Sequence, residues 1–156
     1  MDSLQNQIWG PALWRLLHSS AERIGMKTLH RLPHEESRIW SQVLQSLRYS
    51  LPCPQCKRHY QTYFISYPLS SLVTKEEVRI WLYRLHEAVN QRLGKPGTLS
   101  LTEVEERYSA PFCFSEAVGT ITGQMRVGIQ RGWCSREDVV RTLRYLEEMK
   151  RFYDFF

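Results

Sequence analysis

Helical periodicity runs through nearly all of the 156-residue chain and limits the folds open to it. Apolar residues recur at spacings of three and four, which place them on one face of an α-helix. No segment of useful length alternates apolar and polar residues as a half-buried strand does. We therefore expect an all-α protein with helices over residues 3–25, 34–50, 53–67, 74–93, 102–109, 114–131 and 135–153.

Capping residues mark several of the expected helix ends. Ser3 is a suitable N-cap for the first helix, and Gly25 is a suitable stop. Thr74, with Glu77 three residues later, forms the capping-box pattern at the start of the fourth helix. Pro11 falls inside the first helix, where its missing N–H predicts a bend or a late start near residues 9–11.

The composition is that of one globular domain, with a mass of 18.5 kDa and 42% hydrophobic residues. The net charge of +5 is spread along the chain, so we expect no nucleic-acid partner. No apolar run reaches the roughly 20 residues that cross a bilayer. No basic segment precedes an apolar run at the N-terminus either. We expect no membrane partner and a cytosol-like compartment, where four cysteines suit catalysis, metal binding or buried thiols.

Cys53 and Cys56 form a C-x-x-C motif at an expected helix start. Such a pair can close a disulfide and reopen it, and the free N–H groups of a first helical turn favour the thiolate. Lys57 and Arg58 add positive charge nearby. A redox pair is the favoured interpretation, and half of a zinc site or two structural cysteines are the alternatives.

The zinc alternative describes a non-enzymatic helical adaptor. Its ligands would be Cys53, Cys56, His59 and one cysteine from the C-terminal part of the chain. The two cysteines there, Cys113 and Cys134, are 21 positions apart (134 − 113) and do not form a second C-x-x-C pair. This spacing weakens the zinc alternative, and we expect no metal.

Gly10, Trp14 and His18 follow one another at spacings of four and share one face of the first helix. Glycine would let a ligand approach the backbone, tryptophan offers a flat face, and histidine offers a hydrogen bond. For this trio taken alone, a core stripe with one satisfied histidine is the favoured interpretation.

His86 and Asn90 share a face of the fourth helix, with Val89 between them and Lys95 just beyond the helix end. A polar pair on an apolar face suits an aromatic, hydrogen-bonding ligand whose phosphates lie near Lys95. A solvent-facing helix edge is the alternative for these residues.

Three segments taken together resemble the Erv/ALR family of FAD-linked sulfhydryl oxidases. Residues 9–18 are similar to the family's W-G-x-x-x-W-x-x-L-H opening, and residues 53–60 to its C-x-x-C-x-x-H-[FY] segment. Residues 81–96 are similar to its W-x-x-x-x-H-N-x-V-N-x-R-L-G-K-P segment, with Glu87 in place of the asparagine. Order and spacing match over about residues 5–108.

The resemblance implies a four-helix bundle with a short fifth helix, which holds FAD at its mouth. We assign residues 1–110 to this domain and residues 111–156 to a C-terminal helical extension packed on it. The residues implied to bind the cofactor are Gly10, Trp14, His18, Cys56, His59, Tyr63, His86, Val89, Asn90, Lys95 and Tyr108.

The resemblance also implies the reaction. Thiols of protein substrates would reduce the Cys53–Cys56 disulfide, and electrons would pass to FAD and then to oxygen, giving hydrogen peroxide. Two departures from the family pattern stand out. Glu87 puts one cofactor hydrogen bond in doubt, and Leu101 lies where many relatives carry the first cysteine of a structural pair.

Short relatives of this kind occur in large DNA viruses, which suggests a viral enzyme of the host cytoplasm, virus factory or virion. Relatives dimerise through their first two helices, and we expect a homodimer on a surface that the sequence does not identify. Cys113 and Cys134 could form a shuttle disulfide, a staple between the last two helices, or two free thiols.

Overall fold

A computed structural model describes residues 3–26, 32–97 and 99–156, and within these ranges it contains seven α-helices and no β-strand. The all-α prediction is confirmed. The helices are α1 (Leu4–Ala21), α2 (Leu32–Ser50), α3 (Pro54–Ser66), α4 (Lys75–Arg92), α5 (Leu101–Tyr108), α6 (Phe114–Gln130) and α7 (Arg136–Tyr153). Helices α1 to α4 form the bundle, α5 is the short fifth helix, and α6 and α7 form the extension.

Helix α1 corrects two expectations about its ends. It begins at Leu4, so the late start near residues 9–11 is wrong, and Pro11 lies inside it. A proline in a helix interior costs about 3 kcal/mol, but burial of Leu13, Leu16 and other side chains of α1 outweighs that cost. The helix ends at Ala21, and Gly25, with a φ of 82°, lies in the turn that follows.

Side-chain caps fix the starts of several helices. The Ser3 hydroxyl accepts from the backbone N–H of Asn6, and the Thr74 hydroxyl accepts from that of Glu77. The expected capping box at α4 is only half formed, because the Glu77 carboxylate accepts instead from the N–H and hydroxyl of Ser70. That contact ties the middle of the α3–α4 connection to α4.

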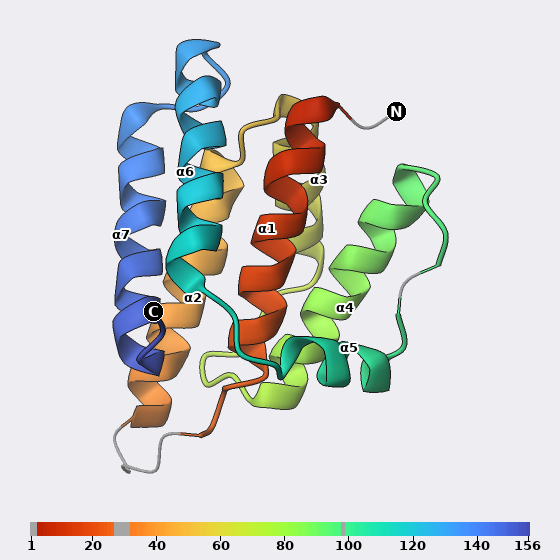
Figure 1. Ribbon diagram of the computed structural model, residues 1–156, viewed down its shortest axis with the longest axis vertical. Coiled ribbons are helices and arrows are strands. Elements are labelled where there is room, and N and C mark those ends of the chain that lie inside the picture. Colours follow the sequence, from red (N-terminus) through yellow and green to blue (C-terminus); the bar gives the residue numbers. More distant parts are fainter. Residues whose placement is uncertain (1–2, 27–31, 98) are drawn as a thin grey trace.

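Helices α6 and α7 lie side by side along one flank of the bundle, next to α1 and α2 (Figure 1). Phe114 and Ile121 of α6 and Leu146 of α7 belong to the same hydrophobic cluster as Leu16 of α1 and Trp40 of α2. One continuous core therefore joins the extension to the bundle.

A buried polar chain holds the end of α7 against α2. The Trp40 indole N–H donates to the Tyr153 hydroxyl over 2.9 Å, and that hydroxyl donates to a Glu36 carboxylate oxygen over 2.6 Å. Burial, followed by the hydrogen bond to Glu36, raises the pKa of Tyr153 well above its usual value. Both contacts depend on the position of one hydroxyl group.

Two arginines hold α5 in place at the bundle edge. Arg23 donates to the backbone carbonyls of Tyr108, Ser109 and Ala110, at distances from 2.6 to 3.2 Å. Arg79 donates to the carbonyl of Leu101 over 3.0 Å. Hydrogen bonds to backbone carbonyls therefore secure both ends of α5. At position 101 the chain has leucine, so no disulfide can hold α5 there.

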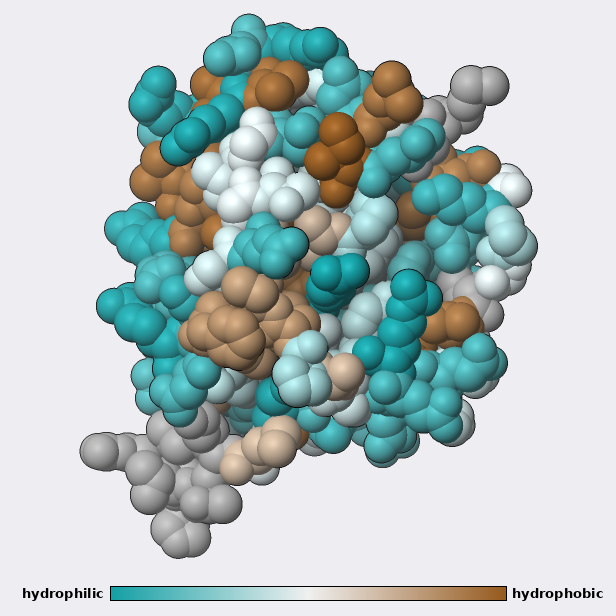
Figure 2. All heavy atoms as spheres, viewed as in Figure 1, coloured by the Kyte–Doolittle hydropathy of each residue, from teal (hydrophilic) through white to brown (hydrophobic). Residues whose placement is uncertain are grey.

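Hydrophilic residues cover much of the face seen in Figure 2, with hydrophobic residues in small groups between them. Across the described ranges, no helix combines the length and apolar character needed to cross a membrane.

Candidate functional site

A cavity of about 530 Å³ lies among α1, α3, α4 and α5. Apolar and aromatic side chains form much of its wall, and four basic side chains also line it. Its walls include Asn6, Trp9, Gly10, Leu13, Trp14, Arg15, Cys56, His59, Tyr60, Tyr63, His86, Val89, Asn90, Arg92, Lys95, Arg107 and Tyr108. Ten of the eleven residues implied to bind a cofactor lie in this wall, and His18 is the exception.

Cys53 and Cys56 are joined by a disulfide at the start of α3. Cys53 is the N-cap residue, and its sulfur accepts a hydrogen bond from the backbone N–H of Cys56 over 3.2 Å. Pro54 follows at the first helical position, where proline suits a helix start. Cys56 lines the cavity, whereas Cys53, also half-buried, is not part of the wall. The two sulfurs therefore have different surroundings.

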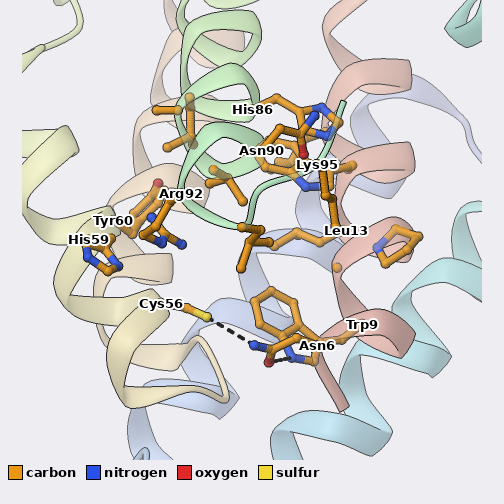
Figure 3. A pocket seen from close by; sticks show the side chains of 18 of the residues that line it. Asn6, Trp9, Leu13, Cys56, His59, Tyr60, His86, Asn90, Arg92 and Lys95 are labelled. Atoms are coloured by element: carbon orange, nitrogen blue, oxygen red, sulfur yellow. Dashed lines mark hydrogen bonds between the residues drawn. The ribbon is translucent and has the colours of Figure 1, made fainter. Parts of the chain in front are cut away.

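Asn6 of α1 contacts both sulfurs, and the sequence analysis missed it. Its amide nitrogen lies 3.5 Å from Cys56 Sγ and 3.6 Å from Cys53 Sγ, and its amide oxygen accepts from the Trp9 indole N–H over 3.0 Å (Figure 3). Asn6 precedes Gly10 by four residues, so it continues the stripe of Gly10 and Trp14. That spacing signals that Asn6 shares the helix face of Gly10 and Trp14, although it does not place Asn6 at the sulfurs.

Two histidines and a tryptophan form a stack between α1 and α4. The rings of Trp14 and His86 lie 4.0 Å apart and nearly parallel, at 7°. His18 Nε2 and His86 Nδ1 are 3.0 Å apart, so one nitrogen donates to the other. His18 is 2% exposed and lies behind His86, because its position on α1 turns it into the core. His18 is therefore not part of the cavity wall, and its expected role in cofactor binding stays a prediction.

Both histidines of this stack are neutral near pH 7. Burial, with a smaller contribution from His86, lowers the pKa of His18 to about 3. Burial, followed by the charges of Lys95 and Arg107, lowers the pKa of His86 to about 4. A neutral pair can share one hydrogen bond and still present a flat, uncharged ring to a ligand.

The basic residues Arg15, Arg92, Lys95 and Arg107 line the cavity. In Figure 3, Lys95 lies with His86 and Asn90 at the side of the pocket opposite Cys56. Lys95 directly follows the turn that ends α4, and its backbone N–H donates to the Asn90 carbonyl over 2.9 Å. This end of the cavity suits negatively charged groups.

Tyr63 and His59 extend the wall along α3. The Tyr63 hydroxyl donates to the Trp81 carbonyl over 2.8 Å, which fixes its ring, and burial raises its pKa to about 12. Burial and the charges of Arg92 and Arg58 lower the pKa of His59. Glu87, the departure from the family pattern, lies outside the wall, so its carboxylate does not line the cavity.

The other two cysteines are free thiols at opposite ends of α6. Cys113 is the N-cap residue of α6, and Cys134 follows the turn after it. A helix of 17 residues spans about 25 Å, far beyond the reach of a disulfide. Cys134 is buried near Pro52, since a side chain on Gly128 would meet both its sulfur and that proline. The staple between the last two helices is therefore not formed.

Across the described ranges, no three His, Cys, Asp or Glu side chains gather to hold a metal ion. The disulfide also occupies both sulfurs that the zinc alternative needs as thiolate ligands. A planar, partly anionic ligand suits the cavity better, because flat aromatic walls, basic residues and a reducible disulfide meet there. These features define a helical-bundle protein in which one sulfur of a disulfide lies in the wall of a large pocket.

The sequence profile of the Erv1 / Alr family matches residues 11–109, which is more than half of the chain. The chain therefore belongs to the Erv1/Alr family.

Viral proteins are among its relatives. The FAD-linked sulfhydryl oxidase of an African swine fever virus isolate (Pig/Kenya/KEN-50/1950) is 29% identical over 93 residues, covering 56% of this chain and 69% of that protein. The 088R protein of Frog virus 3 is 31% identical over 88 residues, covering 56% of this chain and 58% of that protein. The 096R protein of Invertebrate iridescent virus 3 is 29% identical over 119 residues, covering 76% and 77%. No solved structure matches the chain significantly.

Proposed function

We propose that the protein is an FAD-dependent sulfhydryl oxidase that forms disulfide bonds in protein substrates. Substrate thiols would supply electrons through Cys53 and Cys56 to FAD, and molecular oxygen would accept them as hydrogen peroxide. One observation carries the proposal: a disulfide at a helix N-terminus has one sulfur in the wall of a pocket lined by stacked aromatic rings. Membership of the Erv1/Alr family and the name of the African swine fever virus relative support it.

The pocket wall fits FAD in its chemistry. Gly10 has open space where a side chain would project, so a flat ring system can approach the α1 backbone there. Trp14 and Tyr63 would contact the flavin, together with Cys56, His59 and Tyr108. His86, Val89, Asn90 and Lys95 would hold the adenine, ribose and phosphate groups. When bound, FAD supplies the two-electron chemistry that links a dithiol to oxygen.

The residues of the chain divide the thiol chemistry between two sulfurs. A substrate thiolate attacks Cys53, the sulfur outside the pocket wall, and forms a mixed disulfide. The bond between Cys53 and Cys56 breaks, and its electron pair leaves on Cys56 as a thiolate. A second substrate thiolate then attacks the substrate sulfur of the mixed disulfide. The substrate leaves as a disulfide, and Cys53 leaves as a thiolate.

Helix α3 favours these charged intermediates. Its N-terminal N–H groups point toward the sulfurs, and the N–H of Cys56 already donates to Cys53. The cofactor's phosphates need positive charge, which the neutral stack of Trp14 and His86 does not supply. The four basic residues of the cavity wall are therefore the groups suited to the phosphates.

A spectrum tests the cofactor part of the proposal, and oxygen uptake tests the activity. The purified full chain should carry the yellow flavin absorbance and consume oxygen with dithiothreitol. Cys56→Ser should keep the flavin and lose turnover, whereas Cys134→Ser should keep both, because Cys134 is a free thiol. A folded chain that stays colourless after addition of FAD would refute the cofactor assignment. Stoichiometric zinc without flavin would favour the adaptor.

We propose that residues 1–110 form the FAD-binding part and residues 111–156 an extension that completes its core.

The homodimer also stays a proposal. Parts of α1 and α2 are covered by α6 and α7, so a dimer would use other surfaces of those helices or of the extension. Light scattering on the full chain measures the oligomeric state, and a monomeric mass at all concentrations would contradict the dimer.

The proposed setting is the cytoplasm of a host cell or a virus factory, with the virion as a further location. The viral relatives support this setting. An oxidase is useful there because the cytosolic glutathione pool opposes stable disulfides. Fractionation of infected cells with an antibody to the chain tests the proposal, and accumulation in the secretory pathway would contradict it.

A further inference from the structure

We propose that Asn6 is a catalytic residue whose side-chain amide stabilises the thiolate formed when the Cys53–Cys56 disulfide opens. The inference rests on the proposed thiol-oxidase function and adds a residue to it. Asn6 lies before the segment that resembles the family opening, and only the folded structure places it at the sulfurs.

The orientation of the Asn6 amide is set by a neighbour. The Trp9 indole N–H can only donate, so the atom that accepts from it over 3.0 Å must be the amide oxygen. The NH₂ group is thereby directed at the sulfurs. It lies 3.5 Å from Cys56 Sγ, as Figure 3 shows, and 3.6 Å from Cys53 Sγ. Trp9 is itself buried in the core, so its indole holds the amide in place.

These hydrogen bonds strengthen as the disulfide opens. A disulfide sulfur is a weak acceptor, whereas a thiolate is a charged one, and charge-assisted hydrogen bonds are about twice as strong as neutral ones. When a substrate thiolate bonds to Cys53, the electron pair of the broken bond resides on Cys56. An interaction that is stronger with this leaving group than with the resting disulfide lowers the barrier.

The amide also complements the backbone donor of α3. Cys53 Sγ already accepts from the Cys56 N–H. Within the described ranges, Asn6 is the side chain whose donor reaches Cys56 Sγ. Because the amide nitrogen is nearly equidistant from the two sulfurs, it can serve whichever of them carries the charge.

Three variants separate this role from simple packing. Asn6→Asp keeps an oxygen for the Trp9 indole but removes the donor and adds a like charge next to the thiolate. Asn6→Leu has a similar volume and removes both the donor to the sulfurs and the acceptor of the Trp9 indole. Gln7→Ala is the matched control, since Gln7 is an exposed neighbour on α1 that does not line the pocket.

The first measurement is the pKa of the Cys56 thiol in the reduced full chain, with any bound flavin retained. Iodoacetamide pulses under anaerobic conditions over a range of pH label the thiolate, and mass spectrometry locates the label on Cys56. Loss of one charge-assisted hydrogen bond should raise this pKa by about one unit in Asn6→Leu. Asn6→Asp should raise it further, and Gln7→Ala should leave it unchanged.

The second measurement is the rate at which dithiothreitol opens the disulfide. A leaving thiol with a pKa one unit higher should slow this step severalfold, because a thiol of lower pKa leaves faster. Both measurements report on the sulfurs directly, and neither needs flavin or oxygen to give a signal. A colourless, inactive protein would therefore refute the proposed function and leave the Asn6 result readable.

An unchanged Cys56 pKa in both Asn6 variants, with normal folding by circular dichroism, would overturn the inference. A rise of the Cys56 pKa in Asn6→Leu but not in Asn6→Asp would also overturn the inference. Loss of the Trp9 hydrogen bond, and not loss of the amide donor, would then explain the rise. If one variant fails to fold, an unchanged Cys56 pKa in the other still overturns the inference, since each lacks the donor.

Discussion

The stacked histidines predict a specific loss of stability in mild acid. The folded chain resists protonating His18 and His86 until about pH 3 and 4, whereas an unfolded histidine takes up a proton near pH 6.5. Between these values the unfolded state binds more protons, so stability rises with pH. The stabilising effect of the neutral pair is complete above pH 6.5 and is lost as the pH falls from 6.5 toward about 4 for His86 and about 3 for His18.

The size of the loss follows from the same values. At pH 5, 1.5 units below the unfolded pKa, His18 loses about 2 kcal/mol of unfolding free energy, at about 1.4 kcal/mol per unit. His86 is only partly buried, so solvent screening reduces its share to about 1 kcal/mol. The expected loss between pH 7.5 and pH 5 is thus about 3 kcal/mol, a large part of the stability of a single domain.

Urea unfolding followed by circular dichroism, with equal FAD in every sample, measures this dependence. His18→Gln should be less stable at pH 7.5, because it leaves His86 without its partner, but its stability should fall less steeply between pH 6.5 and 5. His34→Gln is the matched control, since His34 is exposed and should keep the wild-type slope. Equal slopes in wild type and His18→Gln would refute the assignment of a neutral buried pair.

Two further substitutions test the pocket and the C-terminal anchor. Gly10→Leu should leave the fold intact, since nothing lies within 4 Å of the added Cβ, yet weaken FAD binding at least about tenfold by occupying the cavity. A flavin titration measures both affinities, and Gly119→Leu, at an open glycine of α6, is the control that should leave FAD binding unchanged. Equal affinities for the two variants would contradict the position of the cofactor. Tyr153→Phe leaves the Trp40 indole and the Glu36 carboxylate without their shared hydroxyl, so unfolding free energy should fall by about 3 kcal/mol. Tyr145→Phe is its control on the same helix, and a similar melting temperature for the two variants would refute the importance of the hydroxyl.

Local sequence signals predicted the helices well because they depend on neighbours in the chain. Apolar spacing, together with capping residues and prolines, identified the seven helices of the described ranges, and the N-caps at Ser3 and Thr74 act over three residues. Pro11 was misjudged for a physical reason. Its local cost is real, but the buried side chains of α1 on either side of it keep the helix intact.

The candidate site was predicted in part. Spacing brought Gly10, Trp14 and the α4 residues to one pocket wall, because residues four apart share a helix face. The placement of His18 behind His86, and of Asn6 on the two sulfurs, depends on how α1 packs against α4 and α3. No spacing within one helix carries that information.

The sequence by itself determined that the chain is helical, that its two paired cysteines open a helix, and that it belongs with the Erv1/Alr proteins. Those properties follow from periodicity, capping and motifs, which are set by residues close together in the chain. Only the tertiary structure decided that the extension shares the bundle core and that a distant amide meets the disulfide. Contacts between segments about 50 residues apart arise from the packing of whole helices, and the sum of many weak contacts selects one arrangement.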